Sequence, residues 1–353
     1  MFLRAVPRKP KGVSQLKHTF THPIFAPLSK AALTAVTVSL IIILGPPETI
    51  SAHGFAGSRF FPATLSTDDP FVADELSLPT VSGIVTPDNG GTRDTEVSSD
   101  IALRITPKWD IEFGEALIML NPSEGKAVNG FSNLSIGSKY EFFENDEHEA
   151  VVSIGLDVDV GGTGSKQVGA DTFSTWTPGL FFGKGLGDLP QGLPWLRPLA
   201  ITGLVGVALP SSARTDGSRN PAVLQSGFAV EYSIIYLQEQ VRNIGLRAPF
   251  DRLIPLVEVS LSDPLDRGQS GLITGTVNPG IIWSGKYFQV GAEAVIPINS
   301  RTGNDVGFIA QLHLYLDDLF SHSLGRPLFG RNRSAQSAVS FSSVFSDFCR
   351  LRM

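Results

Sequence analysis

Apolar and polar positions alternate with a period of two along most of the chain from residue 98 onward. Successive side chains of a strand point to opposite faces of a sheet, so this period predicts strands with one apolar and one polar face. The clearest segments are 100–106, 149–160, 286–298 and 306–316. Noisier alternation predicts further strands, at 109–119, 131–143, 173–184, 197–209, 225–238, 252–262 and 273–284.

Strand length separates two kinds of β protein. Many of the predicted strands run for about 10–13 residues. Strands of ordinary soluble proteins average five or six residues, whereas a tilted membrane strand needs about 9–11. The lengths therefore favour a membrane barrel over a soluble β-sandwich.

The connections between the predicted strands give a second, independent test. Membrane barrels alternate short periplasmic turns with longer outer loops, and the chain mostly follows this rule, except at 185–196 and 239–251. The alternation requires one more strand before residue 98, and 75–86 is the candidate. The sequence thus predicts an all-β, antiparallel up-and-down transmembrane β-barrel of about 12 strands, with both termini in the periplasm.

The N-terminus has the pattern of an export signal. Residues 1–30 contain six basic residues and no acidic one, and the apolar run 31–44 ends at Gly45. Such a run spans roughly 21 Å as a helix, short of the roughly 30 Å hydrocarbon core. We therefore expect residues 1–52 to form a secretory signal peptide, with an uncleaved anchor as the alternative.

The rest of the chain divides at the limits of the predicted strands. We expect residues 53–74 to be a periplasmic or plug-like lead-in, 75–316 the barrel, and 317–353 a periplasmic tail. Outer-membrane barrels commonly end in an aromatic residue on the last strand, but this chain ends in Met353. The assembly signal is then internal, near 306–316, or the last strand lies elsewhere.

The charge balance limits the partners. Without residues 1–52 the chain keeps 22 of its Lys and Arg residues and 33 of its Asp and Glu residues, a net charge of −11. Nucleic-acid binding needs a basic patch, so this balance argues against nucleic acid as a partner. Cys349 is the single cysteine, so no internal disulfide is expected.

A membrane barrel points its apolar side chains to lipid and its polar ones into the lumen. Charges of both signs in a narrow lumen are expected to pair with each other. We expect either a narrow, partly blocked channel or a set of ionic residues that only hold the barrel together. The candidates for the lumen lining are Arg104, Lys139, Asp157, Asp159, Lys184, Glu231, Glu258, Gln289, Glu293, Gln311 and His313.

No motif supports a cofactor, a metal or a reaction. Residues 183–188 (GKGLGD) resemble a phosphate loop only by composition, because prolines follow where a helix would have to begin. Residues 157–168 begin like a calcium loop, but Val168 stands where the glutamate is needed.

A hydrolase would need a serine beside a histidine; His313 is available, with Ser260 on another strand, but nothing fixes their proximity. We expect no enzyme activity, no cofactor and no metal site.

Several short patterns carry a family resemblance. They are ITP at 105–107, GSKY at 137–140, FGKGLGDLP at 182–190, VNPG at 277–280, QVGAEA at 289–294 and HLYLDD at 313–318. With these patterns the chain resembles bacterial outer-membrane proteins of the phenol-degradation meta-pathway transporter type over roughly residues 98–330. The resemblance implies an outer-membrane barrel, and members of that group are mostly assigned as candidate transporters.

These observations lead to three functional hypotheses. The first is an outer-membrane channel or transporter for small solutes, hydrophobic ones included, in contact with membrane lipid and with the export and barrel-assembly machinery. The second is a structural or surface-interaction barrel with a plugged lumen. The third is a soluble periplasmic β-sandwich that binds a ligand.

Overall fold

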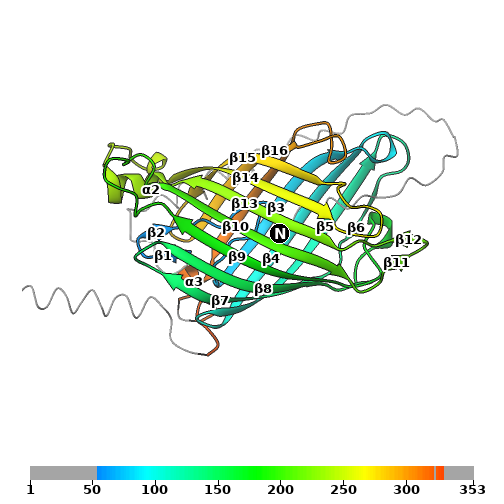
Figure 1. Ribbon diagram of the computed structural model, residues 1–353, viewed down its shortest axis with the longest axis horizontal. Helices are drawn as coiled ribbons and strands as arrows, with labels where there is room; N and C mark the ends of the chain where they lie inside the picture. The colour runs from blue at the N-terminus through cyan, green and yellow to red at the C-terminus, as the bar shows by residue number, and fades with distance from the viewer. Residues whose placement is uncertain (1–53, 322, 330–353) are drawn as a thin grey trace, which may run out of the picture.

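The computed structural model describes residues 54–321 and 323–329, and twelve of their strands form a closed antiparallel β-barrel (Figure 1). Neighbours along the chain pair with each other, and the ring closes because β17 pairs with β3. This fold confirms the all-β barrel and its strand number. The twelve strands are β3 (Glu75–Thr86), β4 (Thr92–Thr106), β5 (Trp109–Pro122), β7 (Ser135–Asn145), β8 (Ala150–Asp159), β9 (Thr175–Gly185), β10 (Leu199–Pro210), β13 (Val223–Tyr232), β14 (Leu253–Pro264), β15 (Thr274–Ser284), β16 (Phe288–Pro297) and β17 (Gly307–Tyr315).

Shorter elements lie at the two ends of the barrel. Strand β6 (Val128–Phe131) pairs with β5 beyond the point where β5 leaves β7. The hairpins β1–β2 (Phe55–Ala56, Arg59–Phe60) and β11–β12 (Arg214–Thr215, Ser218–Arg219) are separate small sheets. The helical turns include α2 (Ile234–Tyr236), the π-helical turn Leu237–Val241 and α3 (Leu316–Leu319).

One predicted strand was too long. The alternation in 225–238 suggested a strand to residue 238, but β13 ends at Tyr232 and a helical turn follows. The Ser233 side chain accepts a hydrogen bond from the Tyr236 backbone N–H, and this cap starts α2. The proposed signal peptide, residues 1–52, lies outside the described residues, as does the tail from residue 330.

The two faces of the barrel wall differ in polarity. On β10, Ala200, Thr202 and Leu204 are buried inside, whereas the alternate residues Ile201 and Val205 are exposed outside. The same alternation leaves aliphatic and aromatic side chains exposed on the outer face of the other strands, among them Phe113, Ile154, Leu180, Phe228, Val230, Val257, Ile281, Val290, Ile296 and Phe308. In the described part of the chain, no helix has the length and apolar character needed to span a membrane.

The connections divide between two ends, which we call the turn end and the loop end. The turn end holds 107–108, 146–149, 186–198, 233–252 and 285–287, and β1, β2, α2 and α3 gather there (Figure 1). The loop end holds 87–91, 123–134, 160–174, 211–222, 265–273 and 298–306. Two turn-end connections are thus long, as the sequence indicated.

Residues 54–74, which we call the lumen segment, pack against the inner face of the barrel. Phe60 and Leu65 belong to an apolar cluster with inward residues of four strands, including Ile254 and Ile282. The rings of Phe61 and Phe71 lie 5.2 Å apart and are tilted by 42°, and both pack in a second cluster, with Val151 and Ala200. The lumen segment therefore supplies much of the core that fills the barrel.

Candidate functional site

The barrel lumen holds most of the polar residues that the alternation predicts to face inward. On the inner face, the structure buries eight of the candidates: Arg104, Lys139, Glu231, Glu258, Gln289, Glu293, Gln311 and His313. Asp157 and Asp159 lie on β8 in register with these positions and are half-buried. The space beside Gly137, where a Cβ atom would lie, is occupied by the Asp157 carboxylate, so Asp157 points across the inner face of β7.

Lys184 lies on the other face of the wall, so its assignment to the lumen was wrong. Its neighbours Gly183 and Gly185 face the lumen segment, at Pro70 and Arg59 respectively. Lys184 alternates with them and instead pairs with Asp188 at 3.2 Å at the turn end. The alternation itself gives this outward face, because Lys184 continues the series of the exposed residues Trp176 and Leu180 on β9, so the inward assignment misread the pattern.

The side chain of Glu258 binds the backbone of the lumen segment. Its carboxylate accepts the backbone N–H groups of Leu65 (2.7 Å), Ser66 (2.9 Å) and Thr67 (2.7 Å). The hydroxyl groups of Ser66 and Thr67 add bonds of 2.7 and 3.0 Å to the same carboxylate. Hydrogen bonds to a charged acceptor are the strong ones in proteins, so one wall residue fixes a three-residue turn of the lumen segment.

Two glycines of the wall make room for this turn. A Cβ atom on Gly227 would lie 2.6 Å from Cγ2 of Thr67, and one on Gly291 would lie 2.6 Å from Cδ1 of Leu65. Cβ atoms do not approach other heavy atoms so closely in real structures. Glycine at these two inward positions therefore allows the lumen segment to lie directly against β13 and β16.

Lys139 holds the next part of the lumen segment. Its ammonium group donates to the Asp68 carboxylate at 2.9 Å and to the Asp69 carbonyl at 2.8 Å. Burial, followed by the nearby charge of Glu75, raises the pKa of the Asp69 carboxyl to about 7, although Lys139 opposes the shift. Asp69 is thus a group that changes charge near neutral pH inside the lumen.

Two arginines anchor the ends of the lumen segment at the turn end. The buried Arg59 side chain donates to the Glu149 carboxylate (3.2 Å) and to the Pro198 carbonyl (2.8 Å), and lies 3.6 Å from the ring centroid of Tyr236. Arg104 binds Asp74 through its backbone N–H (2.6 Å) and Nε (2.7 Å). Both ends of the segment are therefore tied to the wall by buried ionic groups.

Among the described residues, the candidate residues of the lumen lining form their ion pairs with residues outside the candidate set, and not with each other. Arg104 pairs with Asp74 and Asp317, Lys139 with Asp68, and His313 with Glu75. Apart from Asp317, which follows β17, these acidic partners lie in, or directly after, the lumen segment. The expected pairing across the lumen is thus largely replaced by pairing with the lumen segment.

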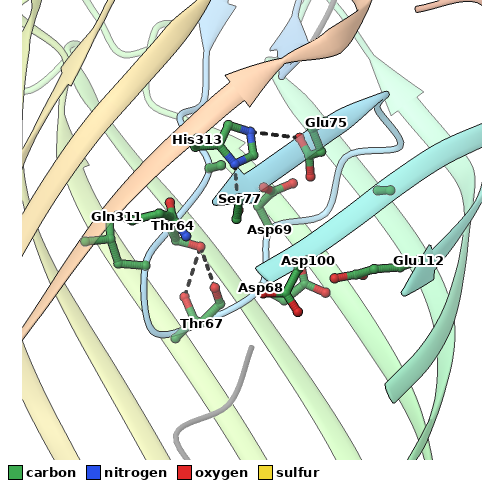
Figure 2. Close-up of a pocket in the computed structure, with 13 residues that line it drawn as sticks. Thr64, Thr67, Asp68, Asp69, Glu75, Ser77, Asp100, Glu112, Gln311 and His313 are labelled. Atoms are coloured by element: carbon green, nitrogen blue, oxygen red, sulfur yellow. Dashed lines mark hydrogen bonds and ion pairs between the residues drawn. The ribbon is translucent and has the colours of Figure 1, made fainter. Parts of the chain in front are cut away.

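A small acidic cavity of about 40 Å³ remains between the lumen segment and strands β3, β4, β5 and β17 (Figure 2). No group of three or more metal-ligating side chains gathers anywhere in the described part of the chain. The cavity is polar enough and large enough to hold water. Its titratable lining residues are Asp68, Asp69, Glu75, Asp100, Glu112 and His313.

Ser77, His313 and Glu75 form a row, with one hydrogen bond and one ion pair, where the first barrel strand, β3, meets the last, β17 (Figure 2). Ser77 Oγ lies 2.9 Å from Nδ1 of His313, and Nε2 of His313 lies 3.2 Å from the Glu75 carboxylate. This order is that of a hydrolase triad. A triad also needs positive groups or N–H donors around the oxyanion, whereas acidic side chains line this cavity, so the row is better explained as a tie that closes the barrel.

Sequence reasoning missed several inward residues. Asp100, Asp110 and Glu112 follow the same alternation as Arg104 and could have been found from it. Asp68, Asp69 and Asp74 gave no such signal, because the lumen segment has no regular period. Their contacts depend on the path of the segment inside the barrel, which no local pattern encodes.

Comparisons with known proteins agree with the fold. No protein-family model and no curated protein sequence matches the chain. An outer membrane channel from Pseudomonas putida F1 is 10% identical with a TM-score of 0.50, over 72% of this chain and 98% of that one. Two further solved structures are similar. The porin NanC is 8% identical with a TM-score of 0.40, over 67% of this chain and 98% of that one. The β domain of the Bordetella autotransporter BrkA is 13% identical with a TM-score of 0.40, over 69% of this chain and 99% of that one.

The chain has the fold of outer-membrane β-barrels. At this level of identity, the likeness to the Pseudomonas channel describes the architecture and leaves function to the residues of the lumen.

Proposed function

We propose that this protein is an outer-membrane channel for small solutes, and that the lumen segment closes it. The apolar outer face suits lipid, and the polar inner face suits a water-filled path. The observation that carries the proposal is the clamp by Glu258, which holds residues 65–67 by hydrogen bonds to a single carboxylate. The strands of the wall pair with one another and not with the lumen segment, so release of the segment would leave the hydrogen bonds of the barrel intact.

The finer points of the proposal rest on the sequence. Residues 1–52 direct export, the assembly machinery inserts the barrel, and both termini stay in the periplasm at the turn end. The resemblance to the phenol-degradation meta-pathway group favours small aromatic or otherwise hydrophobic solutes. The likeness in fold to a Pseudomonas outer membrane channel supports the transport class.

A crosslink across the clamp tests closure by the lumen segment. Ser260 Oγ lies 3.4 Å from the Ser66 carbonyl oxygen, so the two residues are neighbours, and a bifunctional thiol crosslinker should join segment to wall in the variant Ser66→Cys/Ser260→Cys even where a direct disulfide does not form. Cys349 is replaced by serine to prevent wrong pairing. In vesicles of a defined composition, the crosslinked protein should pass no glycine, arabinose or benzoate, whereas the protein without the crosslink should pass at least one of them.

The competing hypothesis is a structural barrel whose lumen stays filled. It predicts no solute flux with or without the crosslink, and that result would overturn the channel proposal. Variants Ser66→Cys and Ser260→Cys alone serve as controls, because neither can form the crosslink. Heat-modifiable gel mobility shows separately that each variant has folded as a barrel.

A further inference from the structure

The connection 233–252 has two parts: its first turn packs over the turn end of the barrel, where Tyr236 lies against Arg59, and its last part lies against the outside of the wall. The indole N–H of Trp283 donates to the Pro249 carbonyl at 3.0 Å. Trp283 alternates on β15 with the buried residues Ile282 and Ser284, so its ring lies on the outer face. The Pro249 end of the connection is therefore held against the part of the wall that faces away from the lumen.

The far part of this connection has a fixed shape. The Gln238 side-chain amide donates to the Leu246 carbonyl (3.2 Å) and accepts the Leu246 backbone N–H (2.9 Å). This pair of bonds closes the loop 238–246 in the way that a pair of strand residues would. Residues 242–250 are nevertheless all exposed, so the loop presents an ordered surface with nothing packed over it.

That surface is apolar and is shared with the other long connection of the turn end. In 233–252, the exposed large apolar side chains are Ile244, Leu246 and Phe250; in 186–198, they are Leu193, Trp195 and Leu196. We call these six residues, with Arg242 and Arg247, the turn-end shelf. Arg242 links its two parts, with the guanidinium carbon 6.0 Å from the Trp195 ring centroid.

The charge of the shelf is positive. Arg242 and Arg247 are exposed, and none of the ion pairs seen among the described residues involves either of them. Arginine beside aromatic and aliphatic side chains at the edge of an apolar barrel wall is the composition of a membrane–water interface. The complementary ligand is an apolar chain with an anionic head.

We propose that the turn-end shelf binds the headgroups of anionic phospholipids in the membrane leaflet at that end of the barrel. Arg242 and Arg247 contact the phosphate groups, and Trp195, Leu246 and Phe250 enter the region of the acyl chains. This explains why these two turn-end connections are long, although a hairpin needs only a few residues. The inference rests on the membrane position of the barrel given under the proposed function.

Native mass spectrometry of the full-length folded protein in detergent measures the binding directly. Dioleoyl phosphatidylglycerol should bind more tightly than dioleoyl phosphatidylcholine, and Arg242→Gln/Arg247→Gln should weaken the phosphatidylglycerol complex by about fivefold for each arginine. The matched control, Arg214→Gln/Arg219→Gln, removes two exposed arginines from the loop end and should leave that affinity unchanged.

Brominated phosphatidylglycerol in vesicles then places the shelf in the bilayer. The component of tryptophan emission that Trp195→Phe removes should be quenched by bromines near the glycerol backbone. Equal affinity for the two lipids, equal loss in the control variant, displacement by inorganic phosphate, or tighter binding of lipopolysaccharide would each overturn the proposal. Failure of the membrane position itself would differ, because the protein would then neither insert into vesicles nor show heat-modifiable mobility.

Discussion

Glu258 accepts two hydrogen bonds from Ser66, one from its backbone N–H at 2.9 Å and one from its hydroxyl group at 2.7 Å. The two residues are far apart in the sequence, and they join the lumen segment to the middle of β14. A buried carboxylate is costly unless it is well hydrogen-bonded. The interaction is therefore mutual, because the lumen segment satisfies Glu258 and Glu258 fixes the lumen segment.

Replacing Glu258 should open the barrel. Glu258→Gln keeps the size of the side chain, but its amide nitrogen cannot accept the N–H groups that the carboxylate oxygen accepts. Hydrogen bonds to a charged group contribute about 1.5–3 kcal/mol each, so the loss of even one should raise the undocked population of the lumen segment at least about tenfold. Solute flux into vesicles should rise accordingly.

Glu124→Gln is the matched control for this experiment. It removes the same charge from an exposed position of a loop-end connection and should leave flux at the level of the unmodified protein. If Glu258→Gln retains that level too, while protease cleavage within residues 61–74 increases, the segment moves without opening a path. That combination would contradict its role as the closure.

Arg104 should be important for stability. Its guanidinium lies 2.7 Å from the Asp74 carboxylate and 3.8 Å from that of Asp317, and all three side chains are buried. Arg104→Met would bury the Asp74 carboxylate without its main cation, which typically costs about 3–5 kcal/mol. Arg104→Lys keeps the charge and loses the forked geometry, so its cost should be smaller.

The measurement is the free energy of unfolding by urea in detergent micelles. Lys108→Met is the comparison, because Lys108 is an exposed cation 3.7 Å from Glu144 and such pairs contribute at most about 1 kcal/mol. Equal losses for Arg104→Met and Lys108→Met would show that the buried cluster adds nothing beyond a surface pair.

The barrel could be predicted because its wall repeats one local rule. Each wall residue faces either lipid or lumen, and residues such as Val257 and Glu258 show the alternation without any knowledge of distant contacts. The number of strands also follows, since the chain reverses its direction at each connection. Applied to Lys184, the rule gives the outer face, because Leu180 and Phe182 precede it at even spacing on β9; the inward assignment of Lys184 did not follow this spacing.

The contents of the lumen could not be predicted in the same way. Whether Glu258 faces water or a bound segment depends on where Ser66 lies in space, and neither residue signals the other in the sequence. The glycines at 227 and 291 are informative only afterwards, because close approach of Thr67 and Leu65 explains them. The faces of the wall residues follow from the local sequence pattern, whereas the docking of the lumen segment depends on contacts between residues far apart in the sequence.

The pH should control the lumen segment through Asp69. Burial raises the pKa of this carboxyl to about 7, so the docked state favours its neutral form. The contribution of Asp69 to docking is then complete below about pH 4 and is lost as the pH rises through about 7. The groups that face it are Asp68, Glu75 and Lys139.

The undocking constant of the lumen segment, and with it solute flux in vesicles, should therefore increase between pH 5 and pH 8, by up to a factor on the order of a hundred. Asp69→Asn keeps a neutral side chain at every pH, so its solute flux should stay low and should not change over that range. The exposed loop-end variant Asp216→Asn should retain the full dependence. An unchanged slope in Asp69→Asn would assign the dependence to other groups.

The outer face of the wall should tolerate no charge if it meets lipid. Val257 is exposed there, between the inward residues Leu256 and Glu258 of β14. An arginine on the lipid side of a barrel costs about 2–4 kcal/mol at the bilayer midplane and about 0–1 near the interface. Val257→Arg should thus lose a few kcal/mol in urea unfolding from lipid vesicles, whereas Val306→Arg, in a loop-end connection, should lose little. If Val257→Arg were as stable as Val306→Arg, this face would be in contact with water, and the barrel would have to be a soluble one.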